Sequence, residues 1–342
     1  MNDARVLVVD DSAAMRALFS DILEQSKGVS VVGTAVDAND ARAQIEELRP
    51  NVLTLDVEMP GMSGIEFLEE IMTTHPLPVV MLSSLTQSGT ETSLKAFELG
   101  AVECFPKPLK VTPEQFAKSV SKLGKIVHAA ANSNVRERKN RAAPKVQDKP
   151  FEWNGHYVAM CASMGGIDAL TTLLEHYPPL CPPTVIALDA DTALVETFVN
   201  KMNRELPFTV AAASEGAELK PGHVYIAYSH DVHTVVEPGN PPRLRMVSRD
   251  PVEGARPSAT LLFASIARSG IAAVGAVLSG LGQDGAKGLQ MMRSAGCPTL
   301  AEDRATATFS ETISAAVDLG AVEKELTIHL LGENIVSRCN AR

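Results

Sequence analysis

Hydrophobic and polar residues alternate along residues 1–128 with two different periods. Short runs rich in Val, Ile and Leu are each followed by a stretch in which apolar residues recur at helical spacing. The predicted strands are RVLVVD at 5–10, VSVVGTA at 29–35, VLTLD at 52–56, VVMLS at 79–83 and VECFP at 102–106. Helices are predicted to follow Ser12, Asn39, Ser63, Ser88 and Thr112. This order predicts an α/β domain with a doubly wound, parallel, five-stranded sheet.

The apolar periodicity stops after residue 128 and resumes near residue 151. Residues 129–150 contain six basic and two acidic residues and read as a linker. A solvated tether is the favoured interpretation, with a docking surface for an acidic partner as the alternative. From 151 to 342 strand, turn and helix patterns recur, which predicts a second, larger α/β domain with a parallel sheet.

Composition narrows the class of protein. The chain has 342 residues, a formal charge of -10 and a sequence pI near 5.4, which argues against a nucleic-acid partner because phosphate binding needs a basic surface. The five cysteines form no C-x-x-C pair, which suits a reducing compartment and no structural zinc. The apolar stretch GIAAVGAVLSG at 270–280 is shorter than the roughly 20 residues that span a bilayer. We therefore expect a cytoplasmic protein without a signal peptide or membrane insertion.

Polar residues stand at the ends of the predicted strands in the first domain. Asp10 and Asp11 end the first strand, Asp56 the third and Ser83 the fourth, and Lys107 follows the fifth. Ligands of open parallel sheets bind beyond the carboxyl ends of the strands, so these side chains are expected to converge. Clustered carboxylates suit Mg²⁺, and with that charge neutralised Asp56 could attack a phosphoryl donor. Taken singly, each acid could simply cap a helix.

The second domain contains a serine in a glycine-rich turn. HYVAMCASMGGIDALTTLLEH, at 156–176, reads as strand, turn and helix, with Ser163 in the turn and Gly165 and Gly166 opening the helix. Such a turn can expose a nucleophilic hydroxyl beside backbone N–H groups, but an anion-binding loop needs the same geometry. Both interpretations stay open from this motif alone. Asp284, in GAVLSGLGQDGAKGLQMM, is placed at the head of another helix, where a simple N-cap is the alternative role.

The first domain resembles the receiver domain of two-component response regulators. The matching motifs are VLVVDDSAAMR, LTLDVEMPGMSGIEFLEEIM, VVMLSSLTQSG and GAVECFPKP. The resemblance implies that Asp56 is the phosphoacceptor and that Ser83 and Lys107 form the switch that responds to the phosphoryl group. It also implies a Mg²⁺ site made of Asp10, Asp11, Asp56 and the backbone carbonyl of Glu58.

Residues 151–331 resemble the catalytic domain of chemotaxis protein-glutamate methylesterases of the CheB type. The motifs are ASMGGIDAL, GHVYIA, RPSATLLFASIA and VLSGLGQDGAKGL, and a receiver joined by a linker to this domain is that family's own arrangement. The resemblance implies a Ser, His, Asp triad, with Ser163 as nucleophile and Asp284 as the acid that orients the base. No cofactor is implied for this domain.

The position of the base departs from the family pattern, because Asp189 stands where the family has histidine. A carboxylate is poorly matched to serve as base at neutral pH, and loss of a triad member typically costs on the order of 10⁴ to 10⁶ in rate. Two compensations are possible. Repulsion between Asp189 and Asp284 could raise the pKa of one of them, or His230 or His233 could reach Ser163.

Two hypotheses for the function follow from these residues. The first is a chemotaxis response regulator that acts as a methylesterase and glutamine deamidase on the cytoplasmic domains of chemoreceptors. A chemotaxis histidine kinase would control it through Asp56. The second is a catalytically impaired regulator or phosphate sink that binds receptor or kinase, because Asp189 replaces the histidine.

Overall fold

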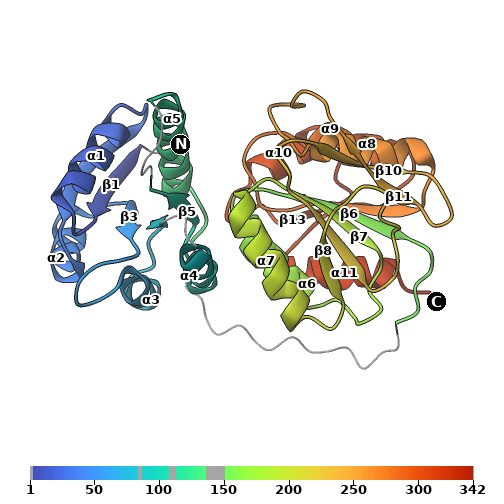
Figure 1. Cartoon of the computed structure of the whole chain (residues 1–342), viewed down its shortest axis with the longest axis horizontal. Helices are drawn as coiled ribbons and strands as arrows, with labels where there is room; N and C mark the ends of the chain where they lie inside the picture. The colour runs from blue at the N-terminus through green and yellow to red at the C-terminus, as the bar shows by residue number, and fades with distance from the viewer. Residues whose placement is uncertain (1–2, 84–86, 108–112, 136–150, 342) are drawn as a thin grey trace. The chain divides into compact units, whose positions relative to one another are not determined.

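The structure is a computed structural model that describes residues 3–83, 87–107, 113–135 and 151–341. Side chains within 84–89 and 108–121 also lie outside the described part of the chain. The chain divides into two compact units, Met1–Arg141 and Ala142–Arg342, and each is described by itself (Figure 1).

The first unit is a five-stranded parallel sheet in the order β2-β1-β3-β4-β5, as the sequence predicted. Helices α1 and α5 cover one face, and α2, α3 and α4 cover the other (Figure 1). The strands are β1 (Ala4–Val9), β2 (Val29–Ala35), β3 (Val52–Asp56), β4 (Val79–Ser83) and β5 (Glu103–Pro106). The helices are α1 (Ala13–Glu24), α2 (Ala38–Leu48), α3 (Gly64–Thr74), α4 (Gln87–Leu99) and α5 (Pro113–Ala131).

Strand bounds in this unit agree with the sequence pattern to within one residue, and two helix starts differ by more. Helices α2 and α4 begin at Ala38 and Gln87, each two residues earlier than predicted. For α2 the reason is that Asp37, not Asn39, is the N-cap, since the Asp37 carboxylate accepts the backbone N–H groups of Asn39 and Asp40. The predicted cap at Thr112 and most of the predicted linker, 136–150, lie outside the described residues.

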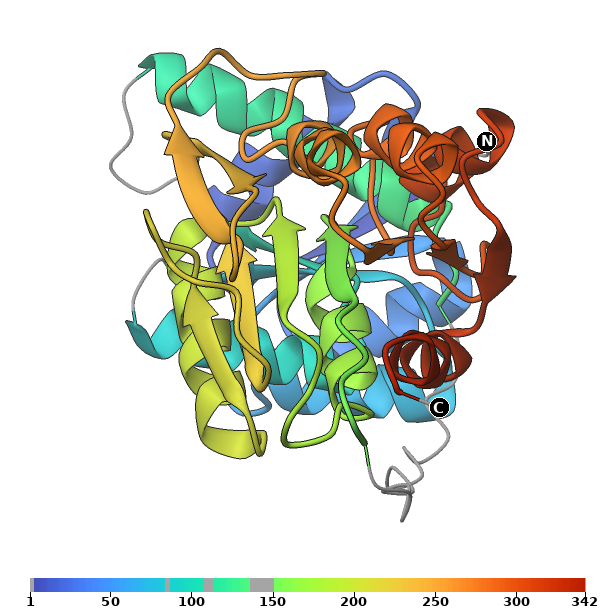
Figure 2. The same cartoon turned by 90° about the vertical axis from the view of Figure 1, so that its right-hand side faces the viewer.

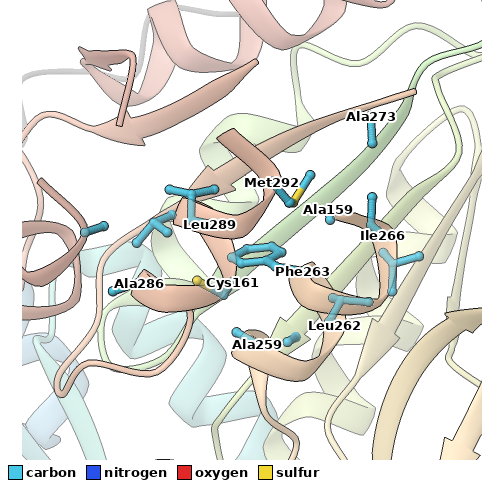
Figure 3. Close-up of a cluster of buried hydrophobic side chains, with 14 of the residues drawn as sticks. Ala159, Cys161, Ala259, Leu262, Phe263, Ile266, Ala273, Ala286, Leu289 and Met292 are labelled. Carbon is cyan, nitrogen blue, oxygen red and sulfur yellow. The ribbon is translucent and has the colours of Figure 1, made fainter. Parts of the chain in front are cut away.

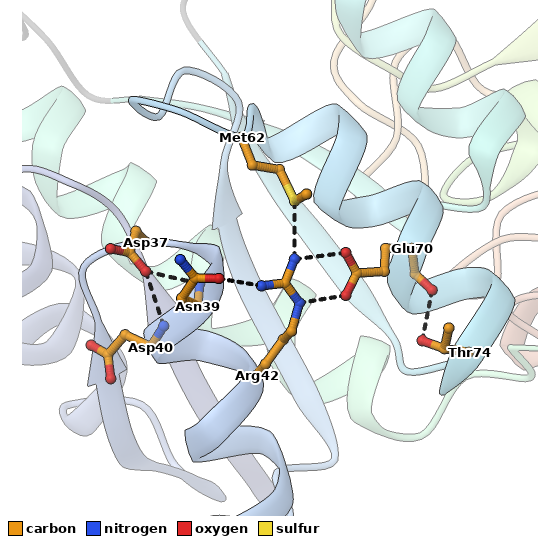
Figure 4. Close-up of polar contacts among 7 residues, drawn as sticks. All are labelled: Asp37, Asn39, Asp40, Arg42, Met62, Glu70 and Thr74. Atoms are coloured by element: carbon orange, nitrogen blue, oxygen red, sulfur yellow. Dashed lines mark hydrogen bonds and ion pairs between the residues drawn. The ribbon is translucent and has the colours of Figure 1, made fainter.

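Helices α2 and α3 are joined by one arginine (Figure 4). The Arg42 guanidinium donates Nε and Nη2 to the two carboxylate oxygens of Glu70, at 2.5 and 2.7 Å. The same group also donates to Asn39 Oδ1 and lies 5.5 Å from the ring centre of Phe67. This fork-shaped pairing fixes α3, which starts after Asp56, against the neighbouring helix.

The second unit contains a seven-stranded parallel sheet in the order β14-β13-β12-β6-β7-β9-β8. Its strands are β6 (Tyr157–Ala162), β7 (Thr184–Leu188), β8 (Thr209–Ala212), β9 (His223–Ala227), β12 (Ala273–Val277), β13 (Thr299–Glu302) and β14 (Lys324–Leu326). An antiparallel ribbon is formed by β10 (His233–Glu237) and β11 (Arg243–Val247). The helices are α6 (Gly166–Leu174), α7 (Thr192–Glu205), α8 (Ala259–Ser269), α9 (Ala286–Ser294), α10 (Glu311–Asp318) and α11 (Ile328–Arg338).

Helices cover both faces of this sheet. In Figures 1 and 2, α6, α7 and α11 lie on one face, and α8, α9 and α10 lie on the other. On the second face Phe263 from α8 and Leu289 and Met292 from α9 pack over Ala159 and Cys161 of β6 (Figure 3). All of these side chains are buried, so the strand end that precedes Ser163 rests on a packed core.

The fold class, the cysteines and the lengths of the helices bear on expectations for the whole chain. The α/β fold class, with a doubly wound receiver-type sheet and a larger parallel-sheet unit, is confirmed. All five cysteines are free thiols. Within the described residues, the helices are too short or too polar for any of them to be a candidate membrane span.

Candidate functional site

The carboxyl ends of the strands in the first unit bring an acidic cluster together. Asp10, Asp11 and Asp56 each place a carboxylate oxygen within 4.8 Å of the others. Asp10 is fully buried and Asp56 is 3% exposed, whereas Asp11 is exposed. Three hard oxygen donors at this spacing, with one open to solvent, fit the ligand preference of Mg²⁺.

Lys107 reaches this cluster from the end of β5. Its Nζ lies 2.7 Å from Asp56 Oδ1 and 2.9 Å from Asp10 Oδ2. Burial lowers the pKa of Lys107, but the hydrogen bonds and charges of Asp56 and Asp10 outweigh burial and raise it overall. For the carboxyl of Asp56 burial has the opposite effect and raises the pKa, while the hydrogen bond and charge of Lys107 lower it. Lys107 therefore stays charged and screens the two buried carboxylates.

Ser83 and Glu58, the other predicted residues, lie at neighbouring strand ends. The buried Ser83 hydroxyl accepts a hydrogen bond of 3.2 Å from Ser93 of α4. The Glu58 backbone N–H donates to Asp56 Oδ1 at 3.3 Å. The start of α3 is also close, since a Cβ on Gly64 would lie 1.8 Å from the Asp56 carbonyl oxygen. Only glycine permits this approach of α3 to the strand end.

In the second unit the three predicted catalytic residues line one pocket of about 280 Å³. Ser163 follows β6, Asp189 follows β7, and Asp284 lies between β12 and α9. The turn after Ser163 is sharp, with Gly165 at φ +71° as the N-cap of α6. The sequence pattern thus located the residues that meet here, because parallel strands end at one edge of the sheet.

The Ser163 hydroxyl has a backbone donor beside it. Leu281 N–H donates to Ser163 Oγ at 3.1 Å, and a Cβ on Gly280 would lie only 2.5 Å from that oxygen. The sequence could not single out Leu281, because its contribution comes from the backbone and not from its side chain. The nearby Cys161 thiol is buried, and this burial together with the charge of Asp284 raises its pKa, so it stays protonated.

Asp284 does not have the role of an N-cap for its own helix. Gly285 is the N-cap of α9, and the Asp284 carboxylate instead binds the start of α8. It accepts the hydroxyl of Ser258 at 2.8 Å and the N–H groups of Ala259 and Thr260 at 2.6 and 3.1 Å. These contacts satisfy the carboxylate oxygens with donors at the start of a helix and tie α8 to the pocket.

The two candidate histidines differ in their surroundings. His233 is fully buried, and both ring nitrogens are engaged, with Nδ1 accepting Ser258 N–H and Nε2 donating to the Asp250 carbonyl, each at 3.1 Å. His233 is therefore held in place and has no ring nitrogen left for Ser163. His230 is about half exposed, and its Nε2 lies 3.3 Å from Asp189 Oδ1.

Two glutamates near Ser163, one in the pocket and one behind it, have no clear signal in the sequence. Glu253 lines the pocket with backbone φ of +53°, accepts the Thr260 hydroxyl at 2.9 Å and pairs with Lys287. Positive φ at a residue that is neither Gly nor Asn is uncommon, but it leaves no simple sequence signal. Glu302 is buried and bonds to the loop behind Ser163, although a strand-end glutamate reads as exposed in the sequence.

Comparisons with known proteins agree for the whole chain. Residues 6–120 match the family model of the response regulator receiver domain, and residues 158–335 match that of CheB methylesterase. The chain is 42% identical to protein-glutamate methylesterase/protein-glutamine glutaminase 1 of Caulobacter vibrioides, over 100% of both chains. It is 41% identical to protein-glutamate methylesterase/protein-glutamine glutaminase of Agrobacterium fabrum, over 99% of this chain and 97% of that one.

Among solved structures, the Thermotoga maritima CheB methylesterase catalytic domain is similar with a TM-score of 0.51 and 23% identity. This similarity covers 54% of the present chain and 99% of that structure, and it supports the fold of the second unit. The relatives that match over the full length, at 41% and 42% identity, show the family of the chain. This chain belongs to the CheB methylesterase family, with a response regulator receiver domain preceding the methylesterase domain.

Proposed function

We propose that this protein is a protein-glutamate methylesterase and glutamine deamidase of bacterial chemotaxis that is controlled by phosphorylation of Asp56. The observation that carries the proposal is the Ser163 hydroxyl, bonded to the Leu281 N–H in a pocket shared with Asp189 and Asp284. Full-length similarity to proteins named for this activity favours the enzyme over the non-catalytic alternative.

The proposed reaction is acyl transfer through Ser163. Its Oγ attacks the carbonyl carbon of a glutamyl methyl ester and loses its proton, and methanol leaves with a proton, giving an acyl-serine. Water then hydrolyses this acyl-serine to glutamate and regenerates the hydroxyl. The Leu281 N–H is suited to donate to the carbonyl oxygen as negative charge develops on it. For glutamine the same sequence releases ammonia.

The base in this scheme is the Asp189–His230 pair. Among the described residues, His230 is the imidazole that contacts an acid of the pocket and is not locked inside the core. It is about half exposed, and its pairing with Asp189 holds it at the end of β7, the strand next to the one that precedes Ser163. Asp284 then acts as a positioning residue, since its carboxylate is committed to the start of α8.

The receiver supplies the control. A chemotaxis histidine kinase donates its phosphoryl group to Asp56, and Ser83 and Lys107 respond to the new charge. Asp10, Asp11 and Asp56 would hold Mg²⁺, with the Glu58 carbonyl, and the ion would neutralise charge during phosphoryl transfer. The substrates would be the cytoplasmic domains of chemoreceptors, which places the protein in the cytoplasm. No cofactor is needed in the esterase chemistry described above.

The test uses the full-length protein and chemoreceptor membranes labelled with methyl-³H. Labelled methanol should be released, faster after treatment with Mg²⁺ and a small phosphoryl donor. The Ser163→Ala variant should release none, and Asp56→Asn should lose the stimulation. If the wild-type protein released no methanol above the Ser163→Ala background in either state, the proposed activity would be wrong.

A further inference from the structure

Glu302 is a buried acid that the proposed reaction does not use. It is the last residue of β13, and only 4% of its surface is exposed. Its Oε2 accepts the backbone N–H of Ser279 at 2.9 Å. Burial raises the pKa of Glu302 to about 7, the hydrogen bond from Ser279 lowers it, and the charges of Asp168 in α6 and of Asp303 raise it.

Ser279, the partner of Glu302, holds the turn that carries the nucleophile. The Ser279 carbonyl accepts the backbone N–H of Ser163 at 3.1 Å. The Ser279 hydroxyl donates to the Met164 carbonyl at 2.9 Å and accepts the N–H of Phe309 at 3.0 Å. Ser279 is fully buried, so these bonds are shielded from water.

The same short loop carries the amide donor. Leu281 is two residues beyond Ser279, and its N–H donates to Ser163 Oγ. The space around these groups is tight, because a Cβ on Gly165 would lie 2.6 Å from Ser279 Oγ. A displacement of Ser279 would therefore change the position of the Ser163 turn and that of the Leu281 N–H together.

We propose that Glu302 is a positioning residue, whose buried hydrogen bond to Ser279 N–H sets the distance between the Ser163 hydroxyl and the Leu281 amide. Glu302 acts through Ser279, two residues beyond the end of β12, whose N–H faces Glu302 and whose carbonyl accepts the Ser163 N–H. The effect of Glu302 on turnover rests on the proposed esterase function. The effect of Glu302 on the position of the loop does not, because the hydrogen bonds exist without substrate.

The first test therefore needs no turnover. Amide NMR of the full-length protein between pH 5.5 and 8.5 should show the Ser279, Leu281 and Ser163 amides titrating together, with an apparent pKa of about 7. Glu302→Gln should abolish this common titration. Glu325→Gln, in the adjacent strand β14 where the carboxylate pairs with Arg304, should leave it intact. If Ser279 alone titrated, or if Glu302→Gln left the Leu281 and Ser163 titrations in place, the proposal would be overturned.

The second test measures turnover of methylated receptor by two variants. Glu302→Leu removes the acceptor and should lower kcat by on the order of 10- to 100-fold, with KM changed less than about twofold, as expected for a misplaced reacting group. Glu302→Gln keeps an oxygen acceptor and should recover most of kcat at pH 8. An equal kcat in wild type and Glu302→Leu would refute the role in catalysis. If wild type itself shows no turnover, the proposed function fails, whereas the amide titrations still decide the role of Glu302 in the loop.

Discussion

Replacement of Glu302 by glutamine should make the second unit more stable at alkaline pH, and the size of the effect follows from burial. The pKa of Glu302 is about 7 in the folded protein, against 4.5 for a free glutamate. The two values differ by about 2.5 pH units, which corresponds to roughly 3 kcal/mol at about 1.36 kcal/mol per unit. Glutamine has nearly the same shape but carries no charge at any pH.

The sign follows from proton linkage. Between pH 4.5 and about 7 the folded state binds more protons at Glu302 than the unfolded state does. The free energy of unfolding of the wild type must therefore fall across this window as pH rises, and the loss is complete above the folded pKa. Below pH 4.5 the carboxyl is neutral in both states, and the two proteins should differ only by their hydrogen bonds.

Urea unfolding followed by tryptophan fluorescence can measure this difference. Trp153, the only tryptophan, lies in the second unit with its ring centre 5.3 Å from that of Tyr157, so it reports on that unit alone. The stability advantage of Glu302→Gln should grow by up to about 3 kcal/mol from pH 4.5 to 8. The exposed ion pair removed in Glu325→Gln should give a difference below about 1 kcal/mol at each pH. An advantage of Glu302→Gln that does not change with pH would show that the pKa of Glu302 is the same in the folded and unfolded states, and would refute the reasoning.

Three further predictions concern other named contacts. Asp189→His should raise methanol release by roughly 10²-fold or more, because a positioned base contributes about 10² to 10⁴ in rate. For the same reason His230→Ala should lower the wild-type rate by a similar factor. Unchanged rates in both variants would exclude the Asp189–His230 pair as the base. Asp284→Ala should cost about 2 kcal/mol in the same Trp153 fluorescence assay, because three donors at the start of α8 lose their acceptor; a cost below about 0.5 kcal/mol would contradict this capping role. Arg42→Ala should destabilise the first unit by only about 1 kcal/mol, since the Arg42 side chain is 36% exposed and solvent screens its pairing with Glu70. Thermal unfolding followed by circular dichroism measures this loss. A loss above about 3 kcal/mol would mean that the Arg42–Glu70 pair acts as a buried one.

Where the sequence pattern was sufficient, the reason is the regularity of parallel sheets. Asp10, Asp56 and Lys107 come from three strand ends far apart in the chain, yet they meet within hydrogen-bonding distance. Ser163 and Asp189 meet in the second unit for the same reason. All parallel strands end at the same edge of the sheet, so a polar residue at the end of a strand must lie at that edge. The periodicity that locates the strands therefore also locates these side chains.

The sequence pattern was insufficient where the partner of a side chain comes from a distant element. His230 and His233 are three residues apart, and only the ribbon β10–β11 and the start of α8 determine that one is exposed and the other buried. Local cap rules offer Asp284 as an N-cap of the helix that follows it, the alternative to its role as triad acid, but its carboxylate binds α8, which precedes it in the chain. Local rules for caps consider neighbours in sequence and miss such contacts.

Two carboxylates of the second unit, Asp284 and Glu302, bind backbone N–H groups, and neither contacts an imidazole among the described residues. Both therefore support the loop and helix ends around Ser163 and leave proton transfer to other groups. In the proposed mechanism the Leu281 amide, which donates to Ser163 Oγ in the structure, would also stabilise the developing oxyanion. Such backbone donors do not require a base and sustain part of an enzyme's rate when the base is removed. A substitution at Asp189 thus acts on proton transfer while the scaffold of the nucleophile persists. The scaffold can persist because its buried bonds lie behind Ser163, in the core, whereas Asp189 and His230 lie at the half-exposed edge.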